Sequence, residues 1–227
     1  MTDLFTQPFF SLNTLVSKFS PVTLSASNIS CSRSGRQLFS AVDITLTSGQ
    51  CLHITGANGI GKTSLMRTLC GLMPNESGHI QWNGVLVQQV RDDFHQNLCY
   101  LGHQNALQES ATVLENLRFA ATLKGLAIDD SSIQLALNRF GLHGSANRLV
   151  RHLSQGQKRR VVLSQLELIQ TPLWVLDEPF VSLDDAGQNS LTDLIAEHLN
   201  HGGMVILTSH QAMSMGDVVP LVLDLQS

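Results

Sequence analysis

Short apolar runs in the first hundred residues alternate with polar residues at the spacing of β-strands. The pattern predicts strands at Val22–Leu24, Val42–Leu46 and Cys51–Thr55, and a hairpin strand at His79–Trp82. That last strand is followed by Asn83-Gly84, a dipeptide that readily adopts the left-handed conformations of a tight turn. The N-terminal part of the chain is therefore expected to be rich in strands.

Helical periodicity appears once in this region and then dominates the middle of the chain. A helix is predicted over Lys62–Cys70, where Gly71 stops it. Thr112, followed three residues later by Glu115, forms a capping box in which each side chain satisfies a backbone donor of the other residue. Two further helices are predicted, from about Ser131 to Phe140 and from Ser154 through Ile169.

Strands return in the last section, at Leu173–Asp177 and Met204–Thr208, with the helix Gln188–Leu199 between them. Strands that alternate with helices are typical of a mostly parallel sheet covered on both faces. We therefore expect an α/β fold in which the helical middle section is an insertion.

Composition and charge narrow the functional classes. The 227-residue chain is 43% hydrophobic and carries a formal net charge of -4, which argues against a dedicated nucleic-acid binder despite the neighbouring Arg159 and Arg160. Its four cysteines form no Cys-x-x-Cys pair, so no zinc ribbon is expected. His198 and His201 are interpreted as cations at a helix end rather than metal ligands. No apolar stretch is long enough to span a membrane, so we expect a soluble chain.

The segment Gly56–Thr63 matches the phosphate-binding pattern G-x-x-x-x-G-K-[ST], between a predicted strand and a predicted helix. Its glycines allow backbone N–H groups to face phosphate oxygens, while Lys62 bridges the terminal phosphates and the Thr63 hydroxyl ligates Mg²⁺. We therefore expect a nucleotide and Mg²⁺ as ligands; the resemblance given below implies that the nucleotide is ATP. The predicted phosphate-binding residues are Gly56, Ala57, Asn58, Gly59, Ile60, Gly61, Lys62, Thr63 and Ser64.

Two carboxylates follow the apolar run Leu173–Leu176 directly. Ligands of open α/β sheets bind at the carboxyl ends of the strands, so Asp177 and Glu178 are expected at the nucleotide. Asp177 is predicted to hold Mg²⁺ through its water shell, and Glu178 to orient or deprotonate the attacking water.

Ser154-Gln155-Gly156-Gln157, which opens a helix after Leu153, resembles the signature sequence of ABC ATPases. Ser154 and Gln157 also form a second capping box, and a hydroxyl beside a bare glycine backbone at a helix N-terminus favours an anion. The resemblance implies that Ser154, Gly156 and Gln157 close on ATP bound to a second copy of the chain in a head-to-tail dimer. Gln155 departs from the usual Gly or Ala.

The resemblance also implies a P-loop NTPase (RecA-like) parallel-sheet core, a small antiparallel β subdomain and an inserted α-helical subdomain. We expect an N-terminal extension over residues 1–20 and an ABC ATPase domain over 21–227. Its RecA-like core would take 21–104 and 171–227, and the helical subdomain 105–170. Apolar residues recur at helical spacing in the extension, which allows either an amphipathic helix or a loosely ordered segment.

Further residues match functional positions of ABC ATPases by their order in the chain. Gln104 corresponds to the glutamine that links Mg²⁺ and the γ-phosphate to the membrane partner, Asp184 to the D-loop aspartate and His210 to the switch histidine. Spacing before the phosphate loop points to Arg33 as the group that stacks on adenine, with Phe39 as the alternative.

Within the superfamily, several stretches resemble the CcmA family, the ATPase subunits of cytochrome c maturation (haem exporter) systems. Among them are Leu101-Gly102-His103-Gln104 and Leu176-Asp177-Glu178-Pro179-Phe180. The resemblance implies docking with a CcmB-like membrane subunit at the cytoplasmic face of the bacterial inner membrane, beside CcmC-, CcmD- and CcmE-like proteins. ATP hydrolysis would then drive release of the haem-loaded periplasmic chaperone. His95 and His103 are interpreted as interface or core residues rather than haem ligands.

Three alternatives remain open. The chain could serve an ABC transporter for another small substrate, because the membrane partners choose the cargo. A non-transport ABC protein that acts on DNA or ribosomes needs coiled coils or fused ATPase domains, and the sequence has neither. A P-loop kinase or GTPase is disfavoured by Glu178 directly after Asp177 and by the signature-like helix.

Overall fold

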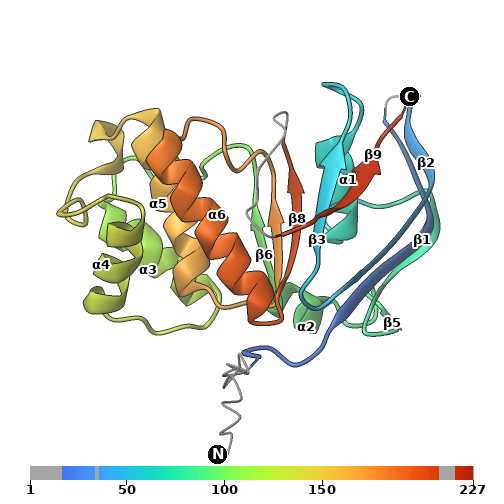
Figure 1. Ribbon diagram of the computed structural model, residues 1–227, viewed down its shortest axis with the longest axis horizontal. Helices are drawn as coiled ribbons and strands as arrows, with labels where there is room; N and C mark the ends of the chain where they lie inside the picture. Colours follow the sequence, from blue (N-terminus) through green and yellow to red (C-terminus); the bar gives the residue numbers. More distant parts are fainter. Residues whose placement is uncertain (1–16, 34–35, 210–217, 227) are drawn as a thin grey trace, which may run out of the picture.

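The computed structural model describes residues 17–33, 36–209 and 218–226. These residues form two sheets, one antiparallel and one parallel, with helices packed around the parallel sheet. Figure 1 shows the antiparallel strands on the right, the parallel sheet in the centre and α3 to α6 on the left. The α/β class with both kinds of sheet is the one predicted from the sequence.

The antiparallel sheet has the strand order β2-β1-β4-β5. Its register shifts between Ala26 and Ile29, where Asn28 adopts a φ of 52°. The buried side chains of β1 therefore step from Leu24 and Ala26 to Ile29 and Cys31, which breaks the period of two. The strands are β1 (Thr23–Arg33), β2 (Arg36–Thr47), β4 (Ser77–Trp82) and β5 (Val85–Leu86).

The parallel sheet has the order β6-β7-β8-β3-β9, and its strands β7 and β8 are buried on both faces. In β8, Met204 and Ile206 pack into the core shared with α1 and the antiparallel sheet, whereas Val205 and Leu207 pack under α5 and α6. The strands are β3 (Cys51–Thr55), β6 (Leu98–Leu101), β7 (Leu173–Leu176), β8 (Met204–Thr208) and β9 (Leu221–Asp224).

A third core joins α3, α4 and α5 through side chains such as Val113, Leu137 and Val161. Both predicted capping boxes are present, Thr112 with Glu115 at α3 and Ser154 with Gln157 at α5. The helices are α1 (Lys62–Leu69), α2 (Arg91–Gln96), α3 (Val113–Leu123), α4 (Asp130–Arg139), α5 (Gln155–Leu168) and α6 (Asp185–Asn200), with a 3₁₀ turn at Val150–His152.

Most predicted elements are confirmed, with longer or shorter bounds. The strand predicted at Val22–Leu24 is the start of the much longer β1, and the helix predicted from Gln188 begins at Asp185. Neither α2 nor β6 was predicted from the sequence. Within the described residues, no helix is long and apolar enough to cross a membrane.

The strand order places three carboxyl ends side by side. β8 lies between β3 and β7, with Ile54 paired to Thr208 and Leu176 paired to Leu207. The loop after β3 and the acidic pair after β7 therefore flank the end of β8. This edge of the sheet is where an open parallel sheet binds its ligands.

Candidate active site

The loop from Gly56 to Gly61 links β3 to α1 and needs glycine at both of these ends. Gly61 has a φ of 121°, which side-chain-bearing residues rarely adopt. At Gly56, with a φ of 132°, an added Cβ would lie 2.7 Å from the Leu225 carbonyl oxygen. The bare backbone thus permits the tight turn before the N-terminus of α1, whose N–H groups favour an anion.

Lys62 is the first residue of α1 and is buried. Its Nζ donates hydrogen bonds to the carbonyl oxygens of Gly56, at 2.8 Å, and Ala57, at 3.1 Å. The ammonium group therefore lies inside the loop, with two of its three N–H groups engaged by backbone.

Asp177 is buried at the end of β7 and accepts two hydroxyl hydrogen bonds. Thr63 Oγ1 donates to Asp177 Oδ2 at 2.8 Å, and Thr208 Oγ1 donates to Asp177 Oδ1 at 2.9 Å. A hydroxyl beside a carboxylate is an oxygen-only donor pair, which is the chemistry that Mg²⁺ prefers. Among the described residues, no three His, Cys, Asp or Glu side chains gather as a metal site.

Glu178 has a left-handed backbone, with a φ of 51°. Its N–H donates to Thr208 Oγ1 at 2.9 Å, and its carbonyl oxygen accepts from Arg159 Nη2 at 2.9 Å. The residue also lines the cleft beside the phosphate loop. Asp177 and Glu178 are therefore brought to the loop as predicted, while Thr208 and Arg159 were not identified from the sequence as parts of this site.

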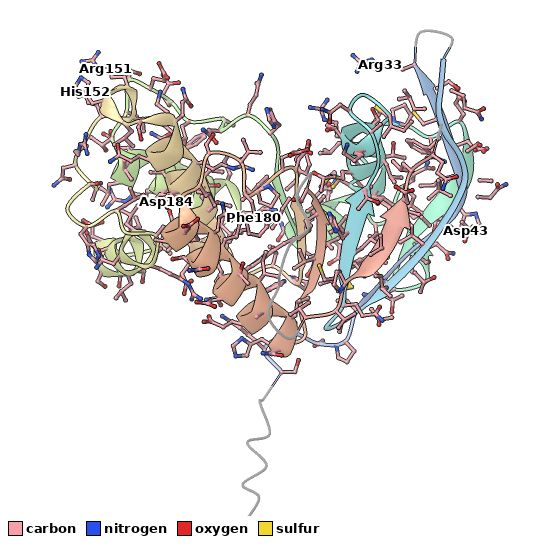
Figure 2. All side chains as sticks on the ribbon, turned by 45° about the horizontal axis from the view of Figure 1, so that its top comes forward. Arg33, Asp43, Arg151, His152, Phe180 and Asp184 are labelled. Atoms are coloured by element: carbon pink, nitrogen blue, oxygen red, sulfur yellow. The ribbon has the colours of Figure 1, made fainter. Side chains whose placement is uncertain are left out.

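The cleft over the phosphate loop has a volume of about 440 Å³. Arg33, at the end of β1, is one of its lining residues, and Figure 2 shows this side chain beside the antiparallel strands. Phe39 is only 4% exposed and packs in the core, so it does not present a ring to this cleft. The described lining residues are Arg33, Leu38, Asn58, Gly59, Gly61, Lys62, Thr63, Ser64, His103, Asp177 and Glu178.

The glutamine predicted to contact Mg²⁺ does not reach the described cleft. Gln104 is exposed and does not line it, whereas its neighbour His103 does. His103 is therefore a cleft residue rather than a core residue, while His95 contacts the Cys70 carbonyl oxygen at 2.9 Å and is structural. His210 lies outside the described residues, so the prediction for it stays a prediction.

The signature-like residues lie on α5, away from the phosphate loop of the same chain. In Figure 2 the neighbouring Arg151 and His152 are at the opposite end of the molecule from Arg33. Ser154 is exposed and caps α5 by accepting from the Gln157 N–H at 3.2 Å. An anion near this helix start would therefore have to come from outside the chain's own cleft.

The turn before α6 packs against the start of α5. A Cβ added to Gly156 would lie 2.8 Å from the Ser182 carbonyl oxygen, so the two backbones touch. Asp184 caps α6 by accepting from the Gly187 N–H at 3.0 Å and pairs with Arg160. The hydrogen bond from the Gly187 N–H, and to a smaller extent the contact with Arg160, lowers the pKa of Asp184 below its usual value. The carboxylate is therefore charged at neutral pH.

Comparison with known proteins agrees with this geometry. The family model described as ABC transporter matches residues 39–181. The chain is 56% identical to the cytochrome c biogenesis ATP-binding export protein CcmA of Albidiferax ferrireducens, over 90% of this chain and 98% of that protein. It is 42% identical to the protein of the same name from Escherichia coli K12, over 86% and 92% of the two chains.

Solved structures show the same fold. A putative ABC transporter ATP-binding protein from Pyrococcus furiosus superposes with a TM-score of 0.78 at 27% identity, over 89% of this chain and 97% of that one. The fold class and the resemblance found in the sequence are both confirmed. The chain therefore belongs to the ABC transporter ATPases and, among them, to the CcmA family of cytochrome c biogenesis ATP-binding export proteins.

Proposed function

We propose that the chain hydrolyses ATP at the site formed by Lys62, Asp177 and Glu178, and that this hydrolysis serves cytochrome c maturation. The observation that carries the proposal is the hydrogen-bonded row Thr63, Asp177 and Thr208 across the carboxyl ends of the strands. These hydrogen bonds join the phosphate loop to the acidic pair Asp177 and Glu178. The phosphates of a nucleotide bound by the loop would therefore lie next to the two carboxylates.

The phosphate loop would bind and orient the nucleotide. The N–H groups at the start of α1 and the Lys62 ammonium favour the negative charge of the β- and γ-phosphates. Arg33 would place its guanidinium plane against adenine at the rim of the cleft. Thr63 and Asp177 would hold Mg²⁺, which supplies charge neutralisation on the phosphates when it is bound.

Glu178 would act on the attacking water. It follows the buried Asp177 and lines the same cleft as Lys62 and Thr63. A carboxylate at that place accepts a proton from water or orients it toward phosphorus, a role worth about 10²–10⁴ in rate. His210, as the switch histidine, and Gln104 would complete the site in the active complex.

A second copy of the chain would complete the site with its own signature residues. Ser154, Gly156 and Gln157 sit at an exposed helix start that does not face the chain's own cleft. A head-to-tail dimer with two ATP molecules between the copies places each helix start on the partner's nucleotide, with Asp184 near the contact.

The membrane context is inferred from the relatives. Their names describe ATP-binding export proteins of cytochrome c biogenesis, and the described residues hold no membrane-spanning helix. We therefore infer a peripheral position at the cytoplasmic face of the inner membrane, on a CcmB-like subunit with CcmC- and CcmD-like proteins. Hydrolysis would release the haem-loaded CcmE-like chaperone in the periplasm.

The test is haem staining of periplasmic c-type cytochromes in a deletion strain. Wild type and the control Glu76→Gln, an exposed glutamate outside the cleft, should both restore the stained bands. Glu178→Gln, produced at the same level, should not. If deletion leaves the bands intact, cytochrome c maturation is the wrong process, and an ABC transporter for another small substrate takes its place.

A further inference from the structure

Arg159 is an unusual residue to find inside this protein. It lies one turn into α5 and is only 3% exposed. Its guanidinium donates to four backbone carbonyl oxygens, and three of them belong to the consecutive residues after β7. The acceptors are Pro179 at 3.3 Å from Nε, Gly102 at 3.0 Å from Nη1, and Asp177 and Glu178 at 3.0 and 2.9 Å from Nη2.

Burying the charged guanidinium of Arg159 costs free energy, which a side chain that only fills space would not need to spend. Burial lowers the pKa of Arg159, opposed by the nearby negative charges of Asp177 and Glu178. In the part of the chain that the structure describes, Arg159 forms no ion pair, so backbone dipoles replace most of its lost hydration. An apolar side chain would avoid this cost, which indicates that the carbonyl contacts themselves are needed.

The contacts fall on the peptide that carries the proposed base. Glu178 has a φ of 51°, a left-handed conformation that costs free energy for any residue with a side chain. Its N–H is held by the Thr208 hydroxyl at 2.9 Å and its carbonyl by Arg159 at 2.9 Å. Both ends of the residue are therefore fixed, and with them the direction in which its carboxylate leaves the backbone.

We propose that Arg159 is a positioning residue for ATP hydrolysis, which holds Glu178 in its left-handed conformation and ties it to the segment at Gly102. The inference rests on the proposed role of Glu178. Arg159 itself does not line the nucleotide cleft, so it acts through the backbone of Glu178 and not on ATP. Because Gly102 begins the segment that leads to Gln104, one side chain joins both parts of the site to α5.

The first test compares Arg159→Gln and Arg159→Lys with wild type in the assembled transporter. A lysine has no fork of donors that reaches four carbonyls, so both variants should lower kcat, by about 10- to 100-fold for a misplaced catalytic group. The KM for ATP should stay within about twofold, since the phosphate loop is untouched. A rise in KM with unchanged kcat would overturn the proposal.

Arg139→Gln is the matched control. Arg139 is a partly buried arginine that joins α4 to Glu167 and Glu197 at 2.7–3.1 Å, away from the cleft. Its loss should lower the unfolding midpoint without changing kcat. If Arg139→Gln and Arg159→Gln lower kcat equally at equal loss of stability, Arg159 is merely structural.

A double-mutant cycle separates this inference from the proposed function. In single-turnover assays, Arg159→Gln should lower the hydrolysis rate in the wild-type background but by less than about twofold in the Glu178→Gln background, because the two residues act as one unit. If Glu178→Gln hydrolyses ATP normally, the role of Glu178 is wrong. If Glu178→Gln is inactive but Arg159→Gln is not, only the positioning role fails.

Thr208 offers an independent approach if the arginine variants do not fold. Thr208→Val keeps the shape of the side chain but removes the hydroxyl that accepts from the Glu178 N–H and donates to Asp177 Oδ1. Rates are therefore compared at saturating Mg²⁺, so that a weakened hold on Asp177 does not account for a lower kcat. It should lower kcat with KM unchanged, and Thr208→Ser should restore the rate. Equal rates in the valine and serine variants would show that fixing the Glu178 backbone does not matter, which would overturn the proposal.

Discussion

Thr63 and Asp177 stand 114 positions apart in the chain and share a hydrogen bond of 2.8 Å. The contact joins the first turn of α1 to the end of β7 across the intervening strand β8. The two oxygens are also the pair that we assign to Mg²⁺. Their approach therefore links the folding of the parallel sheet to the assembly of the cation site.

Thr63→Val should weaken the use of Mg²⁺ by the enzyme. The valine keeps the shape of the side chain but removes one of the oxygen donors, so the Mg²⁺ concentration for half-maximal ATPase activity should rise about tenfold or more. Thr63→Ser, which restores the hydroxyl, should return it close to wild type. A titration of ATPase rate against Mg²⁺ at saturating ATP measures the Mg²⁺ requirement of both variants. An unchanged requirement in Thr63→Val would contradict the assignment of Thr63 as a Mg²⁺ ligand.

Lys62→Ala should sharply reduce ATP binding and turnover. The variant removes the cation that lies inside the phosphate loop, and a charge-assisted contact of this kind is worth about 1.5–3 kcal/mol, which is a loss of roughly 10- to 100-fold in affinity. Lys124→Ala is a matched control, because Lys124 Nζ also donates to two carbonyl oxygens, those of His95 and Leu98, away from the cleft. Binding of a fluorescent ATP analogue distinguishes the two, and equal losses would argue against Lys62 as a phosphate ligand.

Ser154→Arg should block the ATP-dependent dimer while leaving nucleotide binding by the single chain intact. The residue is exposed at the start of α5 and does not line its own cleft, so a bulky cation there interferes only with a second copy. Light scattering in the Glu178→Gln background, with and without ATP, measures dimer formation. Ser131→Arg, in the first turn of α4, controls for the added charge. A normal dimer with Ser154→Arg would rule out the shared site.

Gly156→Ala should disturb the turn before α6 even though it adds a single methyl group. The new Cβ would lie 2.8 Å from the Ser182 carbonyl oxygen, closer than such atoms approach, and backbone must move to relieve it. We expect a fall in ATPase rate of about tenfold from displacement of the turn that carries Asp184, with ATP binding by the single chain unchanged. Wild-type hydrolysis would mean that this turn does not take part in the shared site.

His198 should make the fold sensitive to mild acid. Its ring stacks on Trp174 with centroids 3.6 Å apart, and burial lowers its pKa from 6.5 to about 4, with smaller contributions from Lys18 and His201. The folded chain therefore keeps this ring neutral, so the interpretation of His198 as a cation at the helix end is wrong, while the unfolded chain takes up a proton. The stability that it contributes is complete above about pH 6.5 and is lost as the pH falls toward 4, by an amount on the order of 3 kcal/mol.

Urea unfolding of wild type and His198→Gln between pH 7.5 and 4 tests this prediction. The variant will differ in absolute stability because it loses the stacked ring, so the slope against pH is compared, and not the value. Wild type should lose more free energy of unfolding than the variant over this range, since the other groups titrate in both proteins. Parallel curves would show that His198 is not the residue responsible.

Local signals in the sequence predicted much of the fold. The helix at Lys62, the turn at Asn83-Gly84 and the two capping boxes depend on residues close together in the chain, and the structure confirms all of them. The full length of β1 was missed because the shift at Asn28 breaks the alternation that marks a strand. The short elements α2 and β6 contain too few residues to show a period.

The site was predictable as far as its motifs reach. Asp177, Lys62 and Thr63 meet as expected because each follows or begins a predicted element of a parallel sheet. Thr208 contributes because β8 lies between β7 and β3, and Arg159 contributes because the carbonyl groups after β7 face α5. No spacing in the sequence expresses either relationship, since both arise from strand order and tertiary packing.

The attachment of residues 17–19 has a practical consequence for labelling experiments. Ser17 Oγ and the Lys18 N–H both bond the His201 carbonyl oxygen, at the foot of α6. Figure 1 shows the start of the described chain, in blue, below α6, and β9 to the right of centre beside β3. Leu225, directly after β9, approaches the phosphate loop at Gly56. A fluorophore or affinity tag placed directly after Leu225 would therefore press on the backbone of the phosphate loop, whereas one placed at residue 17 would meet the C-terminal end of α6.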